Sequence, residues 1–383
     1  MNALRKVIYF FKVCCNRLIR LTGSQFVYRL TDQMKFSKLG RRPPELMWQA
    51  LPRCPHIRYD AGGIQIKEKL YAIGGFTQGP PHVLHHIDVF DLARDKWIDA
   101  FATPPNMGTS HLAITGDGER YVYVMGGQVG INCAPATDEC FALDTHTREF
   151  FPLPKLPQAR YSLNAQFYKG RIHVIGGSMP DRNTPAVDYW SLGVNGPKAL
   201  ENEWRKEGVN IPRGGPHRGS MIYNDAFYAF GGQEGDVIAL PGDPEYKPVW
   251  HLTRDIIYPD TYVFKFGTDK WQRLADMPVA ASHTEFSVVR IENCVILVGG
   301  QTERRNNPHK CLITDAVQRY DLKTGQWKVL GRAPYAIKTP IVGHYDGWLY
   351  ITTGQMGKGV GMPDETGPYD CRMWKARVDL TGN

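Results

Sequence analysis

Short apolar segments that end in two small residues recur along the whole chain. Five clear copies and one weaker copy are Tyr71–Gly75, Tyr123–Gly127, His173–Gly177, Tyr228–Gly232, Ile296–Gly300 and Tyr350–Gly354. Their first small residues stand at positions 74, 126, 176, 231, 299 and 353, so the intervals are 52, 50, 55, 68 and 54 residues. This period with paired glycines predicts repeats of one supersecondary unit rather than several unrelated domains.

Each repeat contains the same further segments around this apolar strand. A segment with small residues precedes it, as in Ala61–Ile64, and a strand that ends on aspartate follows it, as at Asp91, Asp144 or Asp321. A tight turn then leads to an aromatic residue. These aromatic residues are Trp97, Phe150, Trp204, Trp271 and Trp327. Four antiparallel strands in each of six repeats predict an all-β, six-bladed propeller with the aromatic residues packed between blades.

The two ends of the chain explain how such a ring closes. The last repeat stops after Met373–Val378, which has the pattern of a third strand, while Met47–Pro52 has the pattern of a fourth. We therefore expect residues 46–52 to complete blade six, which removes the open sheet edges. Residues 1–45 would be a basic segment and linker, and residues 46–383 the propeller. The expected blades are approximately residues 54–105, 106–157, 158–212, 213–278, 279–334, and 335–383 with 46–52.

Composition and charge add a basic N-terminus to this picture. The chain of 383 residues is 42% hydrophobic and has a net charge of +8, which favours anionic partners, but no nucleic-acid-binding motif accompanies the charge. Residues 1–31 hold no Asp or Glu, and Lys12 interrupts their apolar run, so that run cannot span a bilayer. Three interpretations stay open: a basic amphipathic helix on a membrane surface, a transit peptide and a disordered leader.

The eight cysteines give no sign of a metal site. None of them form a Cys-x-x-Cys pair, so zinc is not expected. Cys133 and Cys140 flank one predicted loop. They would form a disulfide in an oxidising compartment and remain thiols elsewhere, and the sequence leaves both open.

Three phrases carry a resemblance to a known family: Ile211–Arg218, Gly231–Asp236 and Gly331–Thr339. With the glycine-paired repeat, they make residues 46–380 resemble the kelch-repeat, galactose-oxidase-like superfamily, and more narrowly a plant group of kelch-repeat proteins. The resemblance implies a propeller fold. For the plant group it also implies an N-terminal membrane anchor in the secretory pathway or Golgi, with a cytoplasmic location as the alternative.

Better understood kelch relatives suggest contrasting chemistries. Galactose oxidases hold copper and have seven blades, and this sequence shows no counterpart of their copper ligands. Specifier proteins of glucosinolate breakdown hold iron with a Glu-x3-Asp-x3-His spacing, which does not occur here. Sialic-acid mutarotases are six-bladed and perform acid–base chemistry without a cofactor. The resemblance therefore favours a site without cofactor or metal over a copper-dependent oxidase.

Candidate functional residues lie where strands enter and leave one face of the propeller. Because strands alternate in direction within a blade, the start of each first strand and the end of each second strand converge around the axis. These positions supply the substrate-binding candidates Arg58, Tyr59, His111, Gln128, Arg160, Tyr161, Arg213, Arg218, Gln233, Glu234, Gln301, Lys338 and Gln355. The candidate acid–base groups are His217, His283 and Glu285. Each can also be structural, because an arginine can brace a loop and a lone histidine is often a satisfied structural group.

Two functions fit this polar face. The basic side chains would bind an anionic or polyhydroxyl, sugar-like molecule while the acid–base candidates move a proton, as in an epimerase, mutarotase, isomerase or cyclase. Alternatively, the propeller is a noncatalytic scaffold that binds a protein or glycan partner through loops 233–260 and 355–369. We expect a monomer that needs no cofactor and binds no nucleic acid, with any peripheral membrane contact made through residues 1–31.

Overall fold

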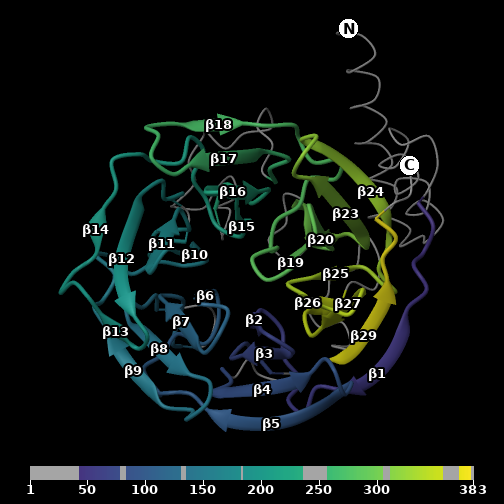
Figure 1. Cartoon of the computed structure of the whole chain (residues 1–383), viewed down its shortest axis with the longest axis horizontal. Coiled ribbons are helices and arrows are strands. Elements are labelled where there is room, and N and C mark those ends of the chain that lie inside the picture. Colours follow the sequence, from purple (N-terminus) through teal and green to yellow (C-terminus); the bar gives the residue numbers. More distant parts are fainter. Residues whose placement is uncertain are drawn as a thin grey trace, which may run out of the picture.

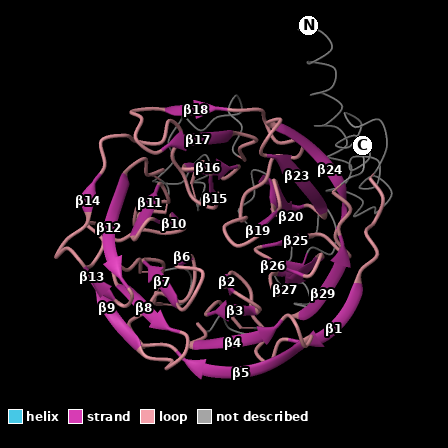
Figure 2. Ribbon diagram, in the orientation of Figure 1, coloured by secondary structure: helices cyan, strands magenta, loops and turns pink. Residues whose placement is uncertain are grey.

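The structure is a computed structural model that describes residues 43–77, 83–130, 135–182, 184–235, 257–304, 311–356 and 371–380. The elements in these ranges are strands arranged around an axis (Figure 1 and Figure 2). Within the same ranges, no helix has the length and apolar character to cross a membrane. The N-terminal segment 1–31 and most of the two long loops expected at 233–260 and 355–369 lie outside the described residues.

Each blade is an antiparallel sheet whose first strand lies near the axis and whose last strand lies at the rim (Figure 1). Blade one consists of β2 (Gly62–Ile66), β3 (Lys69–Ile73), β4 (His86–Asp91) and β5 (Lys96–Ala102). Blade two consists of β6 (Ala113–Gly116), β7 (Tyr121–Met125), β8 (Cys140–Asp144) and β9 (Phe150–Leu153). Blade three consists of β10 (Asn164–Tyr168), β11 (Arg171–Ile175), β12 (Tyr189–Asn195), β13 (Lys198–Ala199) and β14 (Arg205–Lys206).

The second half of the ring repeats this order. Blade four consists of β15 (Gly219–Tyr223), β16 (Ala226–Phe230), β17 (Thr261–Lys265) and β18 (Trp271–Arg273). Blade five consists of β19 (Val288–Ile291), β20 (Cys294–Val298), β23 (Ala316–Asp321) and β24 (Gln326–Arg332). Blade six consists of β26 (Ile341–Tyr345), β27 (Trp348–Thr352), β29 (Arg372–Arg377) and β1 (Gln49–Arg53). Two short pairs lie outside these sheets: β21 (Gln301–Arg304) with β22 (Cys311–Ile313), and β25 (Ile337–Lys338) with β28 (Gln355–Met356).

Blade six joins the two ends of the described chain. β1 runs antiparallel to β29, with Gln49 opposite Lys375. Two tryptophans attach this strand to its neighbours: the Trp48 indole donates to the Arg332 carbonyl of blade five at 2.9 Å, and the Trp97 indole of blade one donates to the Pro52 carbonyl at 3.2 Å. The predicted six-bladed propeller, with its last blade closed by an N-terminal strand, is therefore confirmed.

The paired glycines form the joints between successive blades. The second glycine of each pair donates its N–H to a carbonyl at the entry of the next blade, at Gly75, Gly127, Gly177, Gly232 and Gly300. The first glycine leaves room for that contact. A Cβ on Gly74, which has φ +63°, would lie 2.1 Å from the Thr109 carbonyl oxygen. Glycine is required there because both the backbone conformation and the close approach exclude a side chain.

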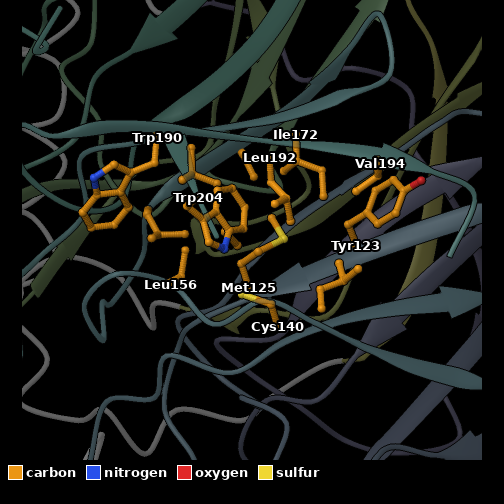
Figure 3. Close-up of a cluster of buried hydrophobic side chains, with 14 of the residues drawn as sticks. Tyr123, Met125, Cys140, Leu156, Ile172, Trp190, Leu192, Val194 and Trp204 are labelled. Carbon is orange, nitrogen blue, oxygen red and sulfur yellow. The ribbon is translucent and has the colours of Figure 1, made fainter. Parts of the chain in front are cut away.

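Hydrophobic side chains fill the interfaces between blades. The cluster between blades two and three contains Met125 and Cys140 from one side and Leu192 and Trp204 from the other (Figure 3). The Trp204 indole also donates to the Pro154 carbonyl of blade two at 2.9 Å. The predicted packing of the repeat tryptophans between blades is confirmed at this position. Each blade is thus held by its neighbours, as expected for a repeat fold.

Candidate functional site

One residue in every blade adopts the same left-handed backbone conformation just before the first strand. These six residues, here called the axial ring, are Asp60, His111, Ser162, His217, His283 and Thr339, with φ from 44° to 65°. Their neighbours pair with the positions after the paired glycines, as Ser110 does with Gln128 and Ser282 with Gln301. A positive φ is uncommon for residues other than glycine. Its presence in all six blades shows that one repeated turn builds this end of the axis.

Hydrogen bonds connect the axial ring from blade to blade. Four backbone bonds run from Ser162 N to His111 O (2.6 Å), His217 N to Ser162 O (3.4 Å), Thr284 N to His217 O (3.4 Å) and Thr339 N to His283 O (3.1 Å). Two side-chain bonds complete the circuit through blade one. The Ser110 hydroxyl donates to the Asp60 carbonyl at 2.9 Å, and the Asp60 amide donates to the Thr339 hydroxyl at 3.3 Å. The turn that carries the candidate residues is therefore fixed on both sides in every blade.

The structure brings the three candidate histidines together. The rings of His217 and His283 are stacked with centroids 3.7 Å apart, and the His111 ring meets the His217 ring edge-on at 5.4 Å. All three are buried, with exposed fractions of 8%, 1% and 5% for His111, His217 and His283. Tyr161 adds an aromatic edge 6.3 Å from His111. These four side chains form one contiguous group, with one member from each of blades two to five.

Glu285 reaches this group because blade five has a longer entry. In blade four, the first residue of the strand pairing, Gly219, stands two positions after His217 in the sequence. In blade five, the corresponding residue, Ser287, pairs with Val298 and stands four positions after His283. The two residues by which this entry is longer than that of blade four form a turn. The turn brings Glu285 across the interface, where its Oε1 lies 2.5 Å from Nδ1 of His217. The predicted acid–base candidates thus lie in direct contact.

The position after the paired glycines behaves differently from blade to blade. The Gln233 amide is fully used, since its Oε1 accepts from the Ser282 hydroxyl at 2.7 Å and its Nε2 donates to the Gly235 carbonyl at 2.7 Å. By contrast, both amide atoms of Gln128 are buried without a hydrogen-bond partner in the described part of the chain. The same holds for Nε2 of Gln301. Buried amides that lack a partner destabilise a fold by about 1–3 kcal/mol each, so these atoms mark a place for a polar molecule or water.

Two candidate arginines, Arg58 and Arg160, are enclosed within their blades. The guanidinium of Arg58 donates to the carbonyls of Ala72 (2.8 Å) and Gly74 (2.9 Å) and pairs with Asp88. Arg160 donates to Asp188 at 3.1 Å, and its guanidinium lies over the Trp190 ring at 4.7 Å. The side chains of Arg58 and Arg160 have no exposed surface. Both therefore brace strand ends instead of projecting from the axial mouth.

Arg218 and Arg213 form a second bracing unit in blade four. Arg218 is 1% exposed and donates to the carbonyls of Gly231 and Arg213. Burial lowers the pKa of Arg218 to about 10. Arg213 lies over the Tyr258 ring at 3.6 Å and pairs with Asp260 at 3.0 Å. Here too a carboxylate accompanies the guanidinium charge.

The remaining candidates line the same end of the axis. Tyr59 stacks at an angle on Phe76 with centroids 5.4 Å apart. The Tyr258 hydroxyl donates to Glu234 at 3.1 Å, and Glu234 is 8% exposed. Lys338 pairs through its backbone with Gln355, and both are largely buried. Of the cysteine pair considered above, Cys140 is a buried thiol and Cys133 lies outside the described residues.

Sequence reasoning missed half of the axial ring and the role of its backbone. Asp60, Ser162 and Thr339 were not among the substrate-binding or acid–base candidates. A signal for them exists: each stands at the position that His111 occupies in its repeat, directly after the residue that bridges to the post-glycine position. Among the described residues, no group of three or more His, Cys, Asp or Glu side chains is arranged to hold a metal ion.

Comparison with known proteins places this architecture in a class. The kelch motif matches residues 283–333. The solved structure of YjhT superposes with a TM-score of 0.63 at 13% sequence identity, covering 81% of this chain and 94% of that one. At that identity, the likeness concerns the fold alone. Five four-stranded blades and one five-stranded blade, together with the kelch motif and this likeness, define a six-bladed kelch propeller.

A plant relative shows the family. A kelch repeat-containing protein of Arabidopsis thaliana is 39% identical over 335 residues, which cover 88% of this chain and 77% of that protein. This chain belongs to the kelch repeat-containing protein family. More distant relatives are kelch-like protein 23 of Homo sapiens, 22% identical over 46% of this chain, and a kelch repeat and BTB domain-containing protein of vaccinia virus, 25% identical over 56%. The matched parts span only 28% and 36% of those two proteins.

Proposed function

We propose that the axial ring binds a small polyhydroxyl or anionic molecule and that His217 exchanges a proton with it. The observation that carries this proposal is the 2.5 Å contact between Glu285 and Nδ1 of His217. An ionised carboxylate only accepts hydrogen bonds, so it favours the proton on Nδ1 and leaves the basic electron pair of a neutral imidazole on Nε2. Histidines that act as general bases are oriented in this way by a carboxylate.

The surroundings of His217 support a sugar-like ligand. The unpartnered amides of Gln128 and Gln301 offer donors and an acceptor, and the Ser162 hydroxyl adds another buried polar atom without a partner in the described ranges. A polyhydroxyl molecule can form hydrogen bonds with several such buried donors and acceptors at once. Three of the arginines predicted to bind a substrate already have their positive charges paired with carboxylates: Arg58 with Asp88, Arg160 with Asp188 and Arg213 with Asp260. This arrangement favours a neutral ligand over a strongly anionic one.

The reaction class that fits is a proton transfer without cofactor, such as mutarotation or epimerisation. Glu285 would act as a positioning residue, because its carboxylate is bound to Nδ1 of His217. His283 would stiffen the imidazole through ring stacking. General acid–base catalysis by one such group typically contributes a factor of about 100–10,000 in rate. The reaction therefore depends on His217 as the group that carries the proton.

The test uses sugars as probes. Glucose, galactose and their uronic acids are incubated with the full chain in D2O, and proton NMR follows the exchange between anomers and the loss of C–H signals. We expect one probe to exchange faster with the wild type and His217→Asn to lose about 99% of that acceleration. His146→Asn, at an exposed histidine of the β8–β9 turn, serves as the matched control and should retain it.

Binding without catalysis would favour the second function. In that case a probe raises the melting temperature equally in wild type and in His217→Asn, and no enzyme-dependent exchange is seen. The propeller would then be a noncatalytic scaffold for a protein or glycan. The loops expected to contact such a partner, 233–260 and 355–369, lie largely outside the described residues, so the axial ring is the part to be tested first.

A further inference from the structure

A pair of cysteines faces each other where the ring closes. Cys54 directly follows β1, and Cys371 directly precedes β29. The last register pair of the two strands is Arg53 with Arg372, so Cys54 stands opposite Cys371. The Cys54 amide donates to the Cys371 carbonyl at 2.6 Å, which extends the antiparallel pairing by one step. Directly opposed residues project their side chains to the same face of a sheet.

This backbone arrangement suits a covalent bond between the two side chains. Hydrogen-bonded residues that oppose each other in an antiparallel pair have Cα atoms about 5.5 Å apart. Disulfides span Cα separations of about 4.4–6.8 Å, so no rearrangement of the strands is needed. Both thiols are buried, with exposed fractions of 4% for Cys54 and 1% for Cys371. We propose that Cys54 and Cys371 form a disulfide that locks the propeller ring covalently.

The surroundings of the two thiols link them to the first blade. The Cys371 sulfur lies 3.1 Å from the Arg58 amide, and the Cys54 sulfur lies 3.3 Å from Oδ2 of Asp88. Arg58 and Asp88 form the buried ion pair of blade one. The cysteines therefore lie beside blade one, at the pairing of β1 with β29 inside blade six, where the two strands are not connected by the continuing chain.

Oxidation must proceed from a locally opened state. Burial raises the pKa of the Cys54 thiol well above its ordinary value, so the closed blade holds little thiolate. β1 is a rim strand whose residues are mostly exposed, and separation of its last register pair uncovers both sulfurs. The reaction should therefore be slow in the closed propeller and faster in mild denaturant.

Glutathione disulfide is a sufficient oxidant for this step. One cysteine thiolate attacks a sulfur of glutathione disulfide, forms a mixed disulfide and releases one glutathione thiolate. The second cysteine thiolate then attacks the protein sulfur of the mixed disulfide and releases the second glutathione. Two cysteines are oxidised to cystine, one glutathione disulfide is reduced to two glutathiones, and the two cysteine protons pass to the released thiolates.

The experiment maps the bond in the full-length protein. The wild type is equilibrated with glutathione disulfide in 1–2 M urea, remaining thiols are blocked with N-ethylmaleimide, and tryptic peptides are analysed by mass spectrometry. We expect peptide 54–58 linked to peptide 359–372. Dithiothreitol should release it, and the oxidised protein should melt roughly 5 °C higher than the reduced protein, because the bond closes a very long loop.

Two variants separate this pair from the other thiols. Cys54→Ala should lose the linked peptide and the rise in melting temperature. Cys294→Ala, at a buried cysteine of β20 that pairs with Asp321 and Ile291, should keep both. The proposal is overturned if wild-type Cys54 and Cys371 carry only N-ethylmaleimide or glutathione after equilibration. Linked peptides between other cysteines in place of 54–58 with 359–372 would overturn it equally, and neither result depends on a variant that folds.

Discussion

At the scale of single residues, two separate physical causes require glycine in the paired positions: a positive φ and the close approach of a neighbouring carbonyl. Gly231 has φ +60°, and a Cβ there would lie 2.1 Å from the Ala281 carbonyl oxygen. That carbonyl accepts the Gly232 amide at 2.9 Å and so holds blade five against blade four. Gly267 shares only the first reason, because it has φ +84° and nothing lies within 4 Å of its Cβ position. Substitutions at Gly231 and Gly267 therefore distinguish the cost of backbone strain from the cost of disturbing the joint between blades.

We predict that Gly231→Ala lowers the free energy of unfolding by roughly 3 kcal/mol or more, since strain and a displaced joint add. Gly267→Ala should cost only about 1 kcal/mol, because it introduces strain alone. Urea unfolding followed by tryptophan fluorescence measures both. Equal losses in the two variants would show that the close contact at the joint contributes little.

A buried histidine makes stability depend on acidity. His173 in β11 is 6% exposed, and its Nδ1 lies 2.7 Å from the Tyr189 hydroxyl. Burial lowers the pKa of His173 to about 4 from an ordinary value of 6.5. The unfolded chain therefore takes up this proton at a higher pH than the folded chain does. Stability from this group is present above pH 6.5 and decreases as the pH falls from 6.5 towards 4.

We predict that His173→Asn weakens this pH dependence. Asparagine can still bond the Tyr189 hydroxyl but cannot take up a proton, so the loss of unfolding free energy between pH 7 and pH 5 should be about 1–2 kcal/mol smaller than in the wild type. His146→Asn, at an exposed position, should leave that loss unchanged. Urea titrations at both pH values provide the comparison, and parallel pH profiles of wild type and His173→Asn would contradict the assignment.

At the scale of elements, the strands could be predicted because their pattern repeats. Six copies of the glycine-paired strand fixed the number of blades, and a missing fourth strand at the C-terminal end pointed to an N-terminal one. That strand was expected over residues 46–52 and is found at Gln49–Arg53. Repetition allows weak signals in one blade to be read from strong signals in another. The degenerate copy at Tyr350–Gly354 could be placed for this reason.

The candidate site could be predicted only as far as the repeat reaches. Convergence of His111, His217 and His283 follows from their shared position in the repeat. The contact between His217 and Glu285 does not, because it depends on a two-residue insertion whose direction the sequence does not encode locally. The burial of Arg58 also escaped prediction, since its partner Asp88 lies on another strand. Pairing between distant positions decides whether an arginine faces a ligand or braces the fold.

At the scale of the whole molecule, the ring has one junction without a chain connection. The chain continues from every blade into the next, including from β1 of blade six into β2 of blade one, whereas inside blade six β1 and β29 are joined by strand pairing and not by the chain. Loss of β1 would expose the edge of β29 and would remove the Pro52 carbonyl from the Trp97 indole. Because each blade is held by its neighbours, damage at this junction should spread around the ring.

We predict that removal of residues 1–53 lowers the melting temperature by roughly 10 °C or more, because it removes the pairing with β29 and the interface to blades one and five. Removal of residues 1–42, which leaves β1 and Trp48 in place, should change it by less than about 2 °C. Differential scanning calorimetry of both truncations against the full chain measures the difference. If both truncations melt at the same temperature as the full chain, β1 does not hold the ring, and the remaining contacts between blades suffice to keep the propeller closed.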